Sequence, residues 1–205
     1  MNIAIIGVGN IGSRLARSWA VRGHRLFLGT SNTNAKKIKD LNTINPDKIS
    51  AHSYADAVKD AVVVLLSVPA KTAFTVANEL GDLSDKIVID AMNSVFGKPD
   101  PYERTSDAVR EATGCKRIVK CFNTIGAENM DNPIYGDERA DMFLCGGEDE
   151  DKQIVKRLAE DIGFNVYDLG GLDLEPVTEN IAKFWGALAH NTGLGRNIAF
   201  KVLRR

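Results

Sequence analysis

Short apolar runs alternate with helix-like periodicities through most of this chain. Residues 2–6 form a run dense in β-branched side chains, which predicts a strand at the very start. Residues 61–66 are apolar throughout, as is typical of a central parallel strand covered on both faces. The same reasoning predicts shorter strands at residues 25–28, 49–51, 86–89, 117–121, 142–145 and 166–168.

Helical spacing fills the gaps between these runs. Apolar or small residues recur with helical period over residues 11–21, and Gly23 is typical of the residue that follows a helix end. Further helices are predicted at residues 35–41, 54–58, 72–80, 106–113, 150–161 and 175–190, and loops at 93–102 and 123–136.

Strands that alternate with helices predict an α/β protein of Rossmann type, with a doubly wound, mostly parallel sheet. The last helix follows the final predicted strand and is therefore an extra element. We expect residues 1–172 to form an NADP-binding domain and residues 173–205 a C-terminal helical extension that provides the acceptor site and a dimer contact. The extension carries four large apolar side chains on one expected stripe, which should pack on the domain or on a second subunit: Ile181, Phe184, Trp185 and Leu188.

Composition narrows the class of protein. The chain has 205 residues and a formal net charge of −1, without the strong basic excess expected of a nucleic-acid-binding protein. Its three cysteines and three histidines show no metal-ligand spacing, and we expect reduced thiols and no metal. We see no membrane-spanning run or secretory signal, and expect a cytoplasmic protein with no membrane partner.

The hexad Gly7-Val8-Gly9-Asn10-Ile11-Gly12 fits G-x-G-x-x-G. Alone the pattern is weak, but here it follows a predicted strand and opens a predicted helix, which is the context of a dinucleotide site. Gly7 permits the tight turn, Gly9 lets the backbone approach the pyrophosphate, and Gly12 lets helix and strand pack closely. The phosphates would meet free N–H groups at the helix N-terminus, where the helix dipole favours negative charge.

The end of the second predicted strand favours NADP over NAD. An acidic residue there would bind the ribose 2′-hydroxyl of NAD, whereas this strand is followed by Thr30, Ser31 and Asn32, with no acid until Asp40. Hydroxyl and amide groups, with Lys36 and Lys37 close behind, suit a 2′-phosphate instead. The alternative is a polar loop and a solvated lysine that contact no ligand.

Two further strand ends should reach the ligand, because the carboxyl ends of parallel strands border the binding crevice. Ser67, Val68 and Pro69 follow the apolar strand, and Asn93 follows the next one. The amide of Asn93 can bond ribose or nicotinamide. A structural role remains open for both, since Pro69 helps to start a helix and Asn93 can cap a loop.

The chain resembles the NADPH-dependent reductases of the deazaflavin coenzyme factor 420. Matching stretches are residues 3–12, 24–30, 64–69, 119–127 and 145–149, and the Gly-Leu-Gly of residues 193–195. Residues 119–124 and 145–147 are also similar to the cytosolic reductase domain of the six-transmembrane metalloreductases.

The resemblance implies roles for individual residues. Residues 8–11 would wrap the pyrophosphate, Thr30, Ser31 and Lys36 would take the 2′-phosphate, and Thr72 would reach the cofactor from a helix. Ile125 and Ala127 fall where the family seats the nicotinamide ring, although Ile125 also suits a purely structural plug. Two positions depart from the family, with Ser31 in place of an arginine and Asn123 in place of a histidine beside the deazaflavin.

We therefore expect an NADP(H)-dependent oxidoreductase that passes a hydride between NADP(H) and a deazaflavin or flavin-like small molecule. Hydride transfer between two ring cofactors needs positioning and exclusion of water more than an acid–base residue, so we name no catalytic side chain. The alternatives are a soluble NADPH reductase of a flavin or ferric complex, and a non-catalytic NADP-binding redox sensor. We expect a homodimer.

Overall fold

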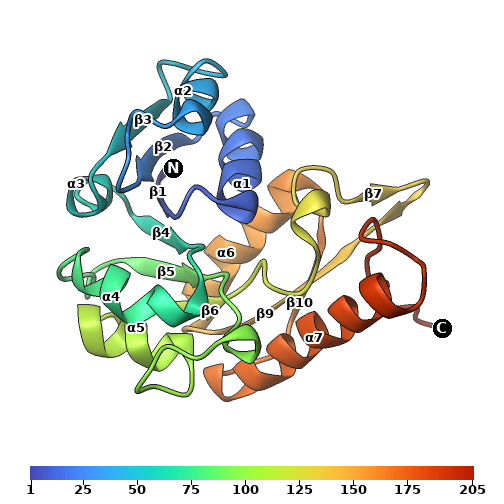
Figure 1. Ribbon diagram of the computed structural model, residues 1–205. Helices are drawn as coiled ribbons and strands as arrows, with labels where there is room; N and C mark the ends of the chain where they lie inside the picture. The colour runs from blue at the N-terminus through green and yellow to red at the C-terminus, as the bar shows by residue number, and fades with distance from the viewer.

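The computed structural model describes residues 1–205 and contains one eight-stranded sheet flanked by helices (Figure 1). The strand order is β10-β9-β6-β5-β4-β1-β2-β3, and β6 and β9 form the one antiparallel pair within this sheet. The strands are β1 (Asn2–Ile6), β2 (Arg25–Gly29), β3 (Ile49–His52), β4 (Val63–Leu66), β5 (Ile87–Asp90), β6 (Ile118–Lys120), β9 (Asp141–Gly146) and β10 (Asn165–Asp168). The predicted Rossmann-type fold with a mostly parallel sheet is confirmed.

Seven α-helices accompany the sheet, at positions close to those predicted. They are α1 (Asn10–Val21), α2 (Lys36–Asn42), α3 (Tyr54–Val58), α4 (Ala73–Asn78), α5 (Thr105–Thr113), α6 (Asp149–Ile162) and α7 (Glu175–Asn191). Four short 3-10 turns precede or join them, η1 (Ala70–Thr72), η2 (Ser94–Phe96), η3 (Ala127–Asn129) and η4 (Leu172–Leu174). Gly23 follows α1 with a φ of 84°, a conformation that glycine adopts without strain.

Alternate residues of each central strand serve two separate cores, because successive side chains of a strand point to opposite faces. On β1, Ile3 and Ile5 belong to the core beneath α1 and α6. Ala4 and Ile6 belong to the core beneath α3, α4 and α5. All four are fully buried, which explains why the central strands show uninterrupted apolar runs.

The segment predicted as a loop at residues 123–136 contains more structure than expected. It includes η3 and the short strand β7 (Ile134–Tyr135), which pairs with β8 (Glu138–Arg139) in a two-stranded ribbon. Strands of two residues are too short to show an alternating pattern, so the sequence carried no signal for this ribbon.

The tail helix α7 lies along one side of the domain, and the chain then turns back toward the β7–β8 ribbon (Figure 1). The apolar stripe predicted for α7 is only partly buried. Trp185 is 6% exposed, but Phe184 is 57% exposed and stacks on Phe200 of the tail. Polar and small residues form most of the buried face instead, namely Glu175, Thr178, Glu179, Ala182 and Ala189.

No helix combines the length and the apolar character needed to cross a membrane.

Candidate functional site

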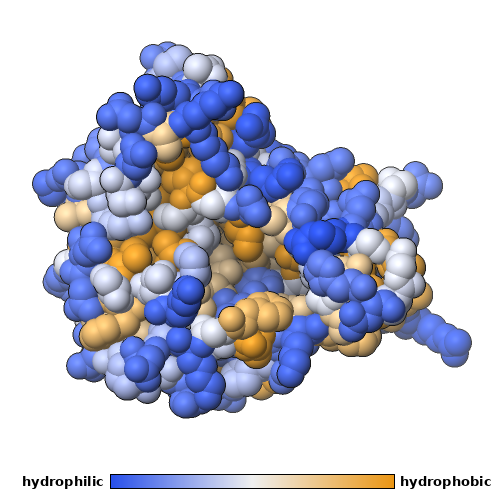
Figure 2. Space-filling view, viewed as in Figure 1, coloured by the Kyte–Doolittle hydropathy of each residue, from blue (hydrophilic) through white to orange (hydrophobic).

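A cavity of about 710 Å³ opens where the carboxyl ends of β1, β4, β5 and β6 face α7. In the space-filling view the hollow at the centre of the molecule shows apolar surface inside a polar rim (Figure 2). The structure brings together nine of the predicted cofactor residues in its wall: Gly9, Asn10, Ile11, Ser67, Val68, Pro69, Asn93, Ile125 and Ala127. The cavity therefore lies outside the carboxyl ends of the strands, where open parallel sheets bind their ligands.

The other predicted residues lie outside this wall. Gly7, Val8 and Gly12 form the turn and helix start behind it, and Thr72 is turned toward the backbone, its hydroxyl donating to the carbonyl of Pro69 at 2.8 Å. The set predicted for the 2′-phosphate lies at the end of β2, beyond the cavity wall: Thr30, Ser31, Asn32 and Lys36.

The three glycines of the hexad differ in what a Cβ atom at each position would contact. Gly7 has a φ of 92°, and a Cβ there would lie 2.8 Å from the carbonyl oxygen of Ser67. A Cβ at Gly12 would collide with the carbonyl oxygen of Gly7 and lie 2.6 Å from the Ser67 hydroxyl oxygen. A Cβ at Gly9 would meet only one atom, 4.0 Å away, so this position is open toward the cavity. Gly7 and Gly12 are thus required by the fold, whereas Gly9 leaves room for a ligand.

Side chains fix the carbonyls of the glycine loop. Ser67 donates to the carbonyl of Gly7 at 2.6 Å, and Ser13 donates to the carbonyl of Gly9 at 2.6 Å. The first N–H groups of α1 have no partner inside the helix, as in every α-helix. The loop therefore presents free donors at a positive helix end, an arrangement that binds phosphate.

The end of β2 is polar and open. Thr30 Oγ1 accepts the N–H of Asn32 at 3.2 Å, and Asn32 Oδ1 accepts the N–H of Asn34 at 3.1 Å, which shapes a compact turn. Lys36 is exposed, whereas the ammonium of Lys37 donates to the carbonyl of Gly9 at 2.8 Å. The second lysine of the pair is thus the one that contacts the glycine loop, a distinction that the sequence alone did not show.

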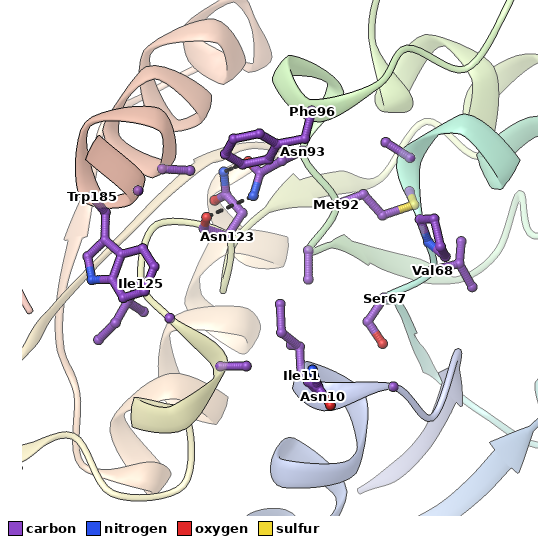
Figure 3. A pocket seen from close by; sticks show the side chains of 18 of the residues that line it. Asn10, Ile11, Ser67, Val68, Met92, Asn93, Phe96, Asn123, Ile125 and Trp185 are labelled. Carbon is purple, nitrogen blue, oxygen red and sulfur yellow. Dashed lines mark hydrogen bonds between the residues drawn. The ribbon is translucent and has the colours of Figure 1, made fainter. Parts of the chain in front are cut away.

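Asn93 and Asn123 face each other in the cavity wall (Figure 3). The amide nitrogen of Asn93 donates to the carbonyl of Asn123 at 3.0 Å, and the amide nitrogen of Asn123 donates to Asn93 Oδ1 at 3.0 Å. The pair joins the segments that follow β5 and β6. Asn93 therefore does more than cap its own loop.

Ile125 follows on the same segment and is 6% exposed. It belongs to the core under α1 and α6 and also lines the cavity, so the two interpretations of this residue are compatible. Its branched side chain supplies an apolar wall near Trp185 (Figure 3).

Helix α7 and the tail supply one side of the cavity, through residues that sequence reasoning did not name as site residues. Trp185, His190 and Arg196 all line it. The Arg196 guanidinium lies 5.1 Å from the Trp185 ring centroid, bonds Glu128 at 2.7 Å and approaches His190 Nε2 at 3.1 Å. The hydrogen bond from Arg196 lowers the pKa of Glu128, so this ion pair persists at neutral pH. No local motif marks these residues, because they meet only after the tail folds back.

A buried charged cluster holds α7 against the sheet. Lys120, at the end of β6, is fully buried, and its ammonium lies 3.2 Å from Asp90, 3.1 Å from Glu175 and 2.9 Å from Glu179. Thr105 Oγ1 completes its contacts at 3.0 Å. Burial alone would lower the pKa of Lys120, but the three carboxyl groups outweigh it and raise the pKa above its ordinary value. Burial also raises the pKa of Asp90.

The same cluster reaches the cavity wall through backbone bonds. Glu179 accepts the N–H groups of Ser94 and Val95 at 2.9 and 3.1 Å, immediately after Asn93. In the sequence, Lys120 lies within a predicted strand, and Glu175 and Glu179 have the pattern of solvent-facing helix residues. Sequence reasoning therefore gave no reason to place them together.

The three cysteines are buried and unpaired with one another. Burial raises the pKa of the Cys145 thiol to about 12 and that of Cys121 also far above its ordinary range, so both stay protonated. Neither lines the cavity.

The fold and the cavity at the strand ends together have the architecture of a Rossmann-type dinucleotide-binding domain. A family model described as "NADP oxidoreductase coenzyme F420-dependent" matches residues 2–94. This match and a relative named as an F420-dependent NADP reductase confirm the resemblance inferred from the sequence motifs.

Relatives with known names are similar to the chain at low identity. The chain is 27% identical to the F420-dependent NADP reductase of Methanocaldococcus jannaschii, over 98% of this chain and 94% of that protein. It is 25% identical to a glycerol-3-phosphate dehydrogenase [NAD(P)+] of Streptococcus gordonii, over 99% of this chain but only 64% of that enzyme. The chain thus spans less than two thirds of the dehydrogenase.

Solved structures show the same architecture over the full length. A protein of Arthrobacter sp. FB24, named as a candidate F420 dependent NADP-reductase, superposes with a TM-score of 0.82 at 22% identity, with 100% of both chains covered. A hypothetical protein of Sinorhizobium meliloti matches with a TM-score of 0.71 at 26% identity, over 100% of this chain and 96% of that one. At such identity these matches establish the fold and no more.

Proposed function

We propose that this protein transfers a hydride between NADP(H) and a planar deazaflavin or flavin-like acceptor. The observation that carries the proposal is the shape of the cavity, which continues from the open glycine loop at Gly9 to an apolar wall formed by Ile125 and Trp185. One end suits a pyrophosphate and the other suits stacked rings. The name of the archaeal relative points to the same pair of substrates.

The residues present fit a dinucleotide. Gly9 leaves open the space that a phosphate would fill, and the first turn of α1 offers its free N–H groups there. Lys37, held at the carbonyl of Gly9, places a positive charge beside the same loop. Thr30, Ser31 and Lys36 at the end of β2, with no acid among them, suit the 2′-phosphate.

In this reaction NADPH supplies a hydride, and the acceptor takes up that hydride and a proton from solvent. The protein positions the two rings and excludes water. Ile125 would press on one ring from the core side and Trp185 would close the side toward α7, while Asn93 holds the end of β5 at the cavity. No group in the wall needs to exchange a proton with the reacting carbon, in keeping with catalysis by positioning.

Two measurements test this proposal. NADPH should bind at least about tenfold more tightly than NADH, equivalent to about 1.4 kcal/mol, and equal dissociation constants by calorimetry would contradict the NADP preference. Oxidation of NADPH should then be followed by the loss of the reduced nicotinamide absorbance at about 340 nm. The acceptors to compare are a deazaflavin, a flavin and a ferric complex. Turnover with the deazaflavin supports the proposal, turnover with another acceptor alone corrects it, and tight binding with no turnover indicates a sensor.

We further propose that residues 173–205 complete the acceptor site and mediate a homodimer. Phe184 and Phe200 stack at 5.8 Å with Phe184 largely exposed, and Leu203 is 85% exposed nearby in sequence. Such apolar side chains on a tail are typical of an intersubunit contact. A monomeric mass by light scattering at micromolar concentration would contradict the dimer.

A further inference from the structure

The side-chain oxygen of Asn123 is a buried acceptor with no hydrogen-bond partner. Asn123 lies just after β6, lines the cavity and is 2% exposed. Leaving such a group unpaired costs about 1–3 kcal/mol, and an unpaired buried acceptor in a native fold calls for an explanation.

The surrounding hydrogen bonds fix which end of the amide is unpaired. The amide nitrogen of Asn123 donates to Asn93 Oδ1 at 3.0 Å and to Thr178 Oγ1 at 3.3 Å, so both of its protons are used. Asn93 Oδ1 is the acceptor there because its own amide nitrogen donates to the Asn123 carbonyl. The Thr178 hydroxyl gives its proton to the carbonyl of Glu175 at 2.9 Å. Turning the Asn123 amide over would set oxygen against oxygen.

The backbone that presents this amide is held in an uncommon conformation. Phe122, the preceding residue, has a φ of 62° and is the only non-glycine residue with a positive φ. Its ring is fully buried and packs edge-on against Trp19 and Phe164, at centroid distances of 5.7 and 6.4 Å. Strained residues of this kind persist where packing enforces them and often mark ligand sites. The position of Asn123 is therefore set by the core and not by chance.

We propose that Asn123 Oδ1 accepts a hydrogen bond from an amide-type N–H of the bound ligand. This inference rests on the proposed function, which supplies two sources of that group: the carboxamide of nicotinamide and the imide N–H of a flavin or deazaflavin ring. Both are planar, as the apolar wall of Ile125 and Trp185 requires, and both present an N–H beside a carbonyl. Asn123 then selects for a ligand that carries this donor.

Pairs of ligands with and without the N–H provide the test. For the cofactor, the dissociation constant of NADP⁺ is compared with that of its 3-acetylpyridine analogue, which keeps the carbonyl but has a methyl in place of the amide nitrogen. For the acceptor, 5-deazariboflavin is compared with its N3-methyl derivative in the presence of NADP⁺. Wild-type protein should bind one analogue about tenfold more weakly than its parent, the effect of one buried hydrogen bond.

Asn123→Ala should abolish that discrimination, and the pair in which it disappears identifies the source of the N–H. Asn78→Ala is the matched control, because Asn78 lies exposed on α4 and bonds only its own helix, and it should retain the discrimination. If Asn123→Ala fails to fold, the ratio of dissociation constants that the wild type shows for each ligand pair still decides whether an N–H is recognised. Discrimination below about twofold in the cofactor pair, together with none in any acceptor pair that binds, overturns the inference. Failure of NADP⁺ to bind at all would instead overturn the proposed function.

Discussion

The two ends of the cavity are built in different ways. The glycine-loop end comes from one continuous stretch, the turn between β1 and α1, with single contributions from Ser67 and Lys37. The α7 end is assembled from β5, β6, α7 and the tail, which are joined by the buried Lys120 cluster and the Arg196–Glu128 pair. One end depends on backbone geometry and the other on long-range pairing of charges.

This difference predicts that the two ends fail differently. A backbone site tolerates changes that leave its turn intact and fails only when a side chain fills the ligand space. A site held by buried ions fails as a unit, because the loss of one charge leaves its partners buried and unpaired. Three experiments test the contrast, in order of decreasing expected effect, and a fourth with a smaller effect concerns a residue outside the cavity.

Lys120→Met should have the largest effect. It removes the one cation that faces Asp90, Glu175 and Glu179 in a fully buried site, and breaking a buried pair in this way costs about 3–5 kcal/mol. Urea unfolding should show the loss directly. Lys59→Met is the control, since Lys59 pairs with Asp56 in the solvent and its loss should leave the unfolding free energy nearly unchanged. Equal effects of the two variants would show that the cluster does not stabilise the α7 end.

Gly9→Val should act on binding and spare the fold. A Cβ at this position meets one protein atom at 4.0 Å, so the free protein can accommodate a side chain that the phosphate cannot share. We expect NADPH affinity to fall at least about 100-fold, or about 2.7 kcal/mol, with little change in unfolding free energy. Gly12→Ala provides the contrast, because its Cβ would collide with the Gly7 carbonyl and should destabilise the fold itself. Normal NADPH binding by folded Gly9→Val would place the phosphate site elsewhere.

Ile125→Gly should separate turnover from binding. The side chain lines the cavity from the core side, where it would press the nicotinamide toward its acceptor and exclude water. We expect the hydride-transfer rate in stopped-flow to fall about tenfold, while NADPH affinity changes little because the phosphates and ribose supply most of it. An unchanged rate in the folded variant would move the hydride site away from this segment.

How far each end could be predicted follows from the same contrast. The glycine hexad, the strand ends at Ser67 and Asn93 and the order of helices and strands are local patterns, and the structure places them as expected. Lys120, Glu175 and Glu179 look like ordinary surface charges in the sequence, because nothing local shows that three carboxyl groups converge on one ammonium. The sequence predicted that Trp185 lies on an apolar stripe of the last helix, but not that its ring faces the cavity. The role of Lys37 over Lys36 depends on the exact start of α2, the least predictable feature of a helix.

The smallest effect is expected at His24, which lies outside the cavity wall and pairs with Asp161 of α6. His24 directly precedes β2 and is 7% exposed, and its Nε2 lies 3.4 Å from Asp161 of α6. Burial, helped by the nearby N-terminal ammonium, lowers the pKa of His24 despite Asp161.

The sign of the pH dependence follows from that shift. The unfolded chain binds the proton more tightly than the folded one, so the contribution of neutral His24 is fully present above its unfolded pKa of about 6.5 and is lost as the pH falls from there through the lower folded pKa. Unfolding free energy should therefore decline between about pH 7 and pH 5 more steeply in the wild type than in His24→Gln, which cannot take up the proton. Parallel pH profiles for the two proteins in urea unfolding would show that His24 titrates alike in both states. A steeper profile in His24→Gln would mean that Asp161, rather than burial, controls the histidine.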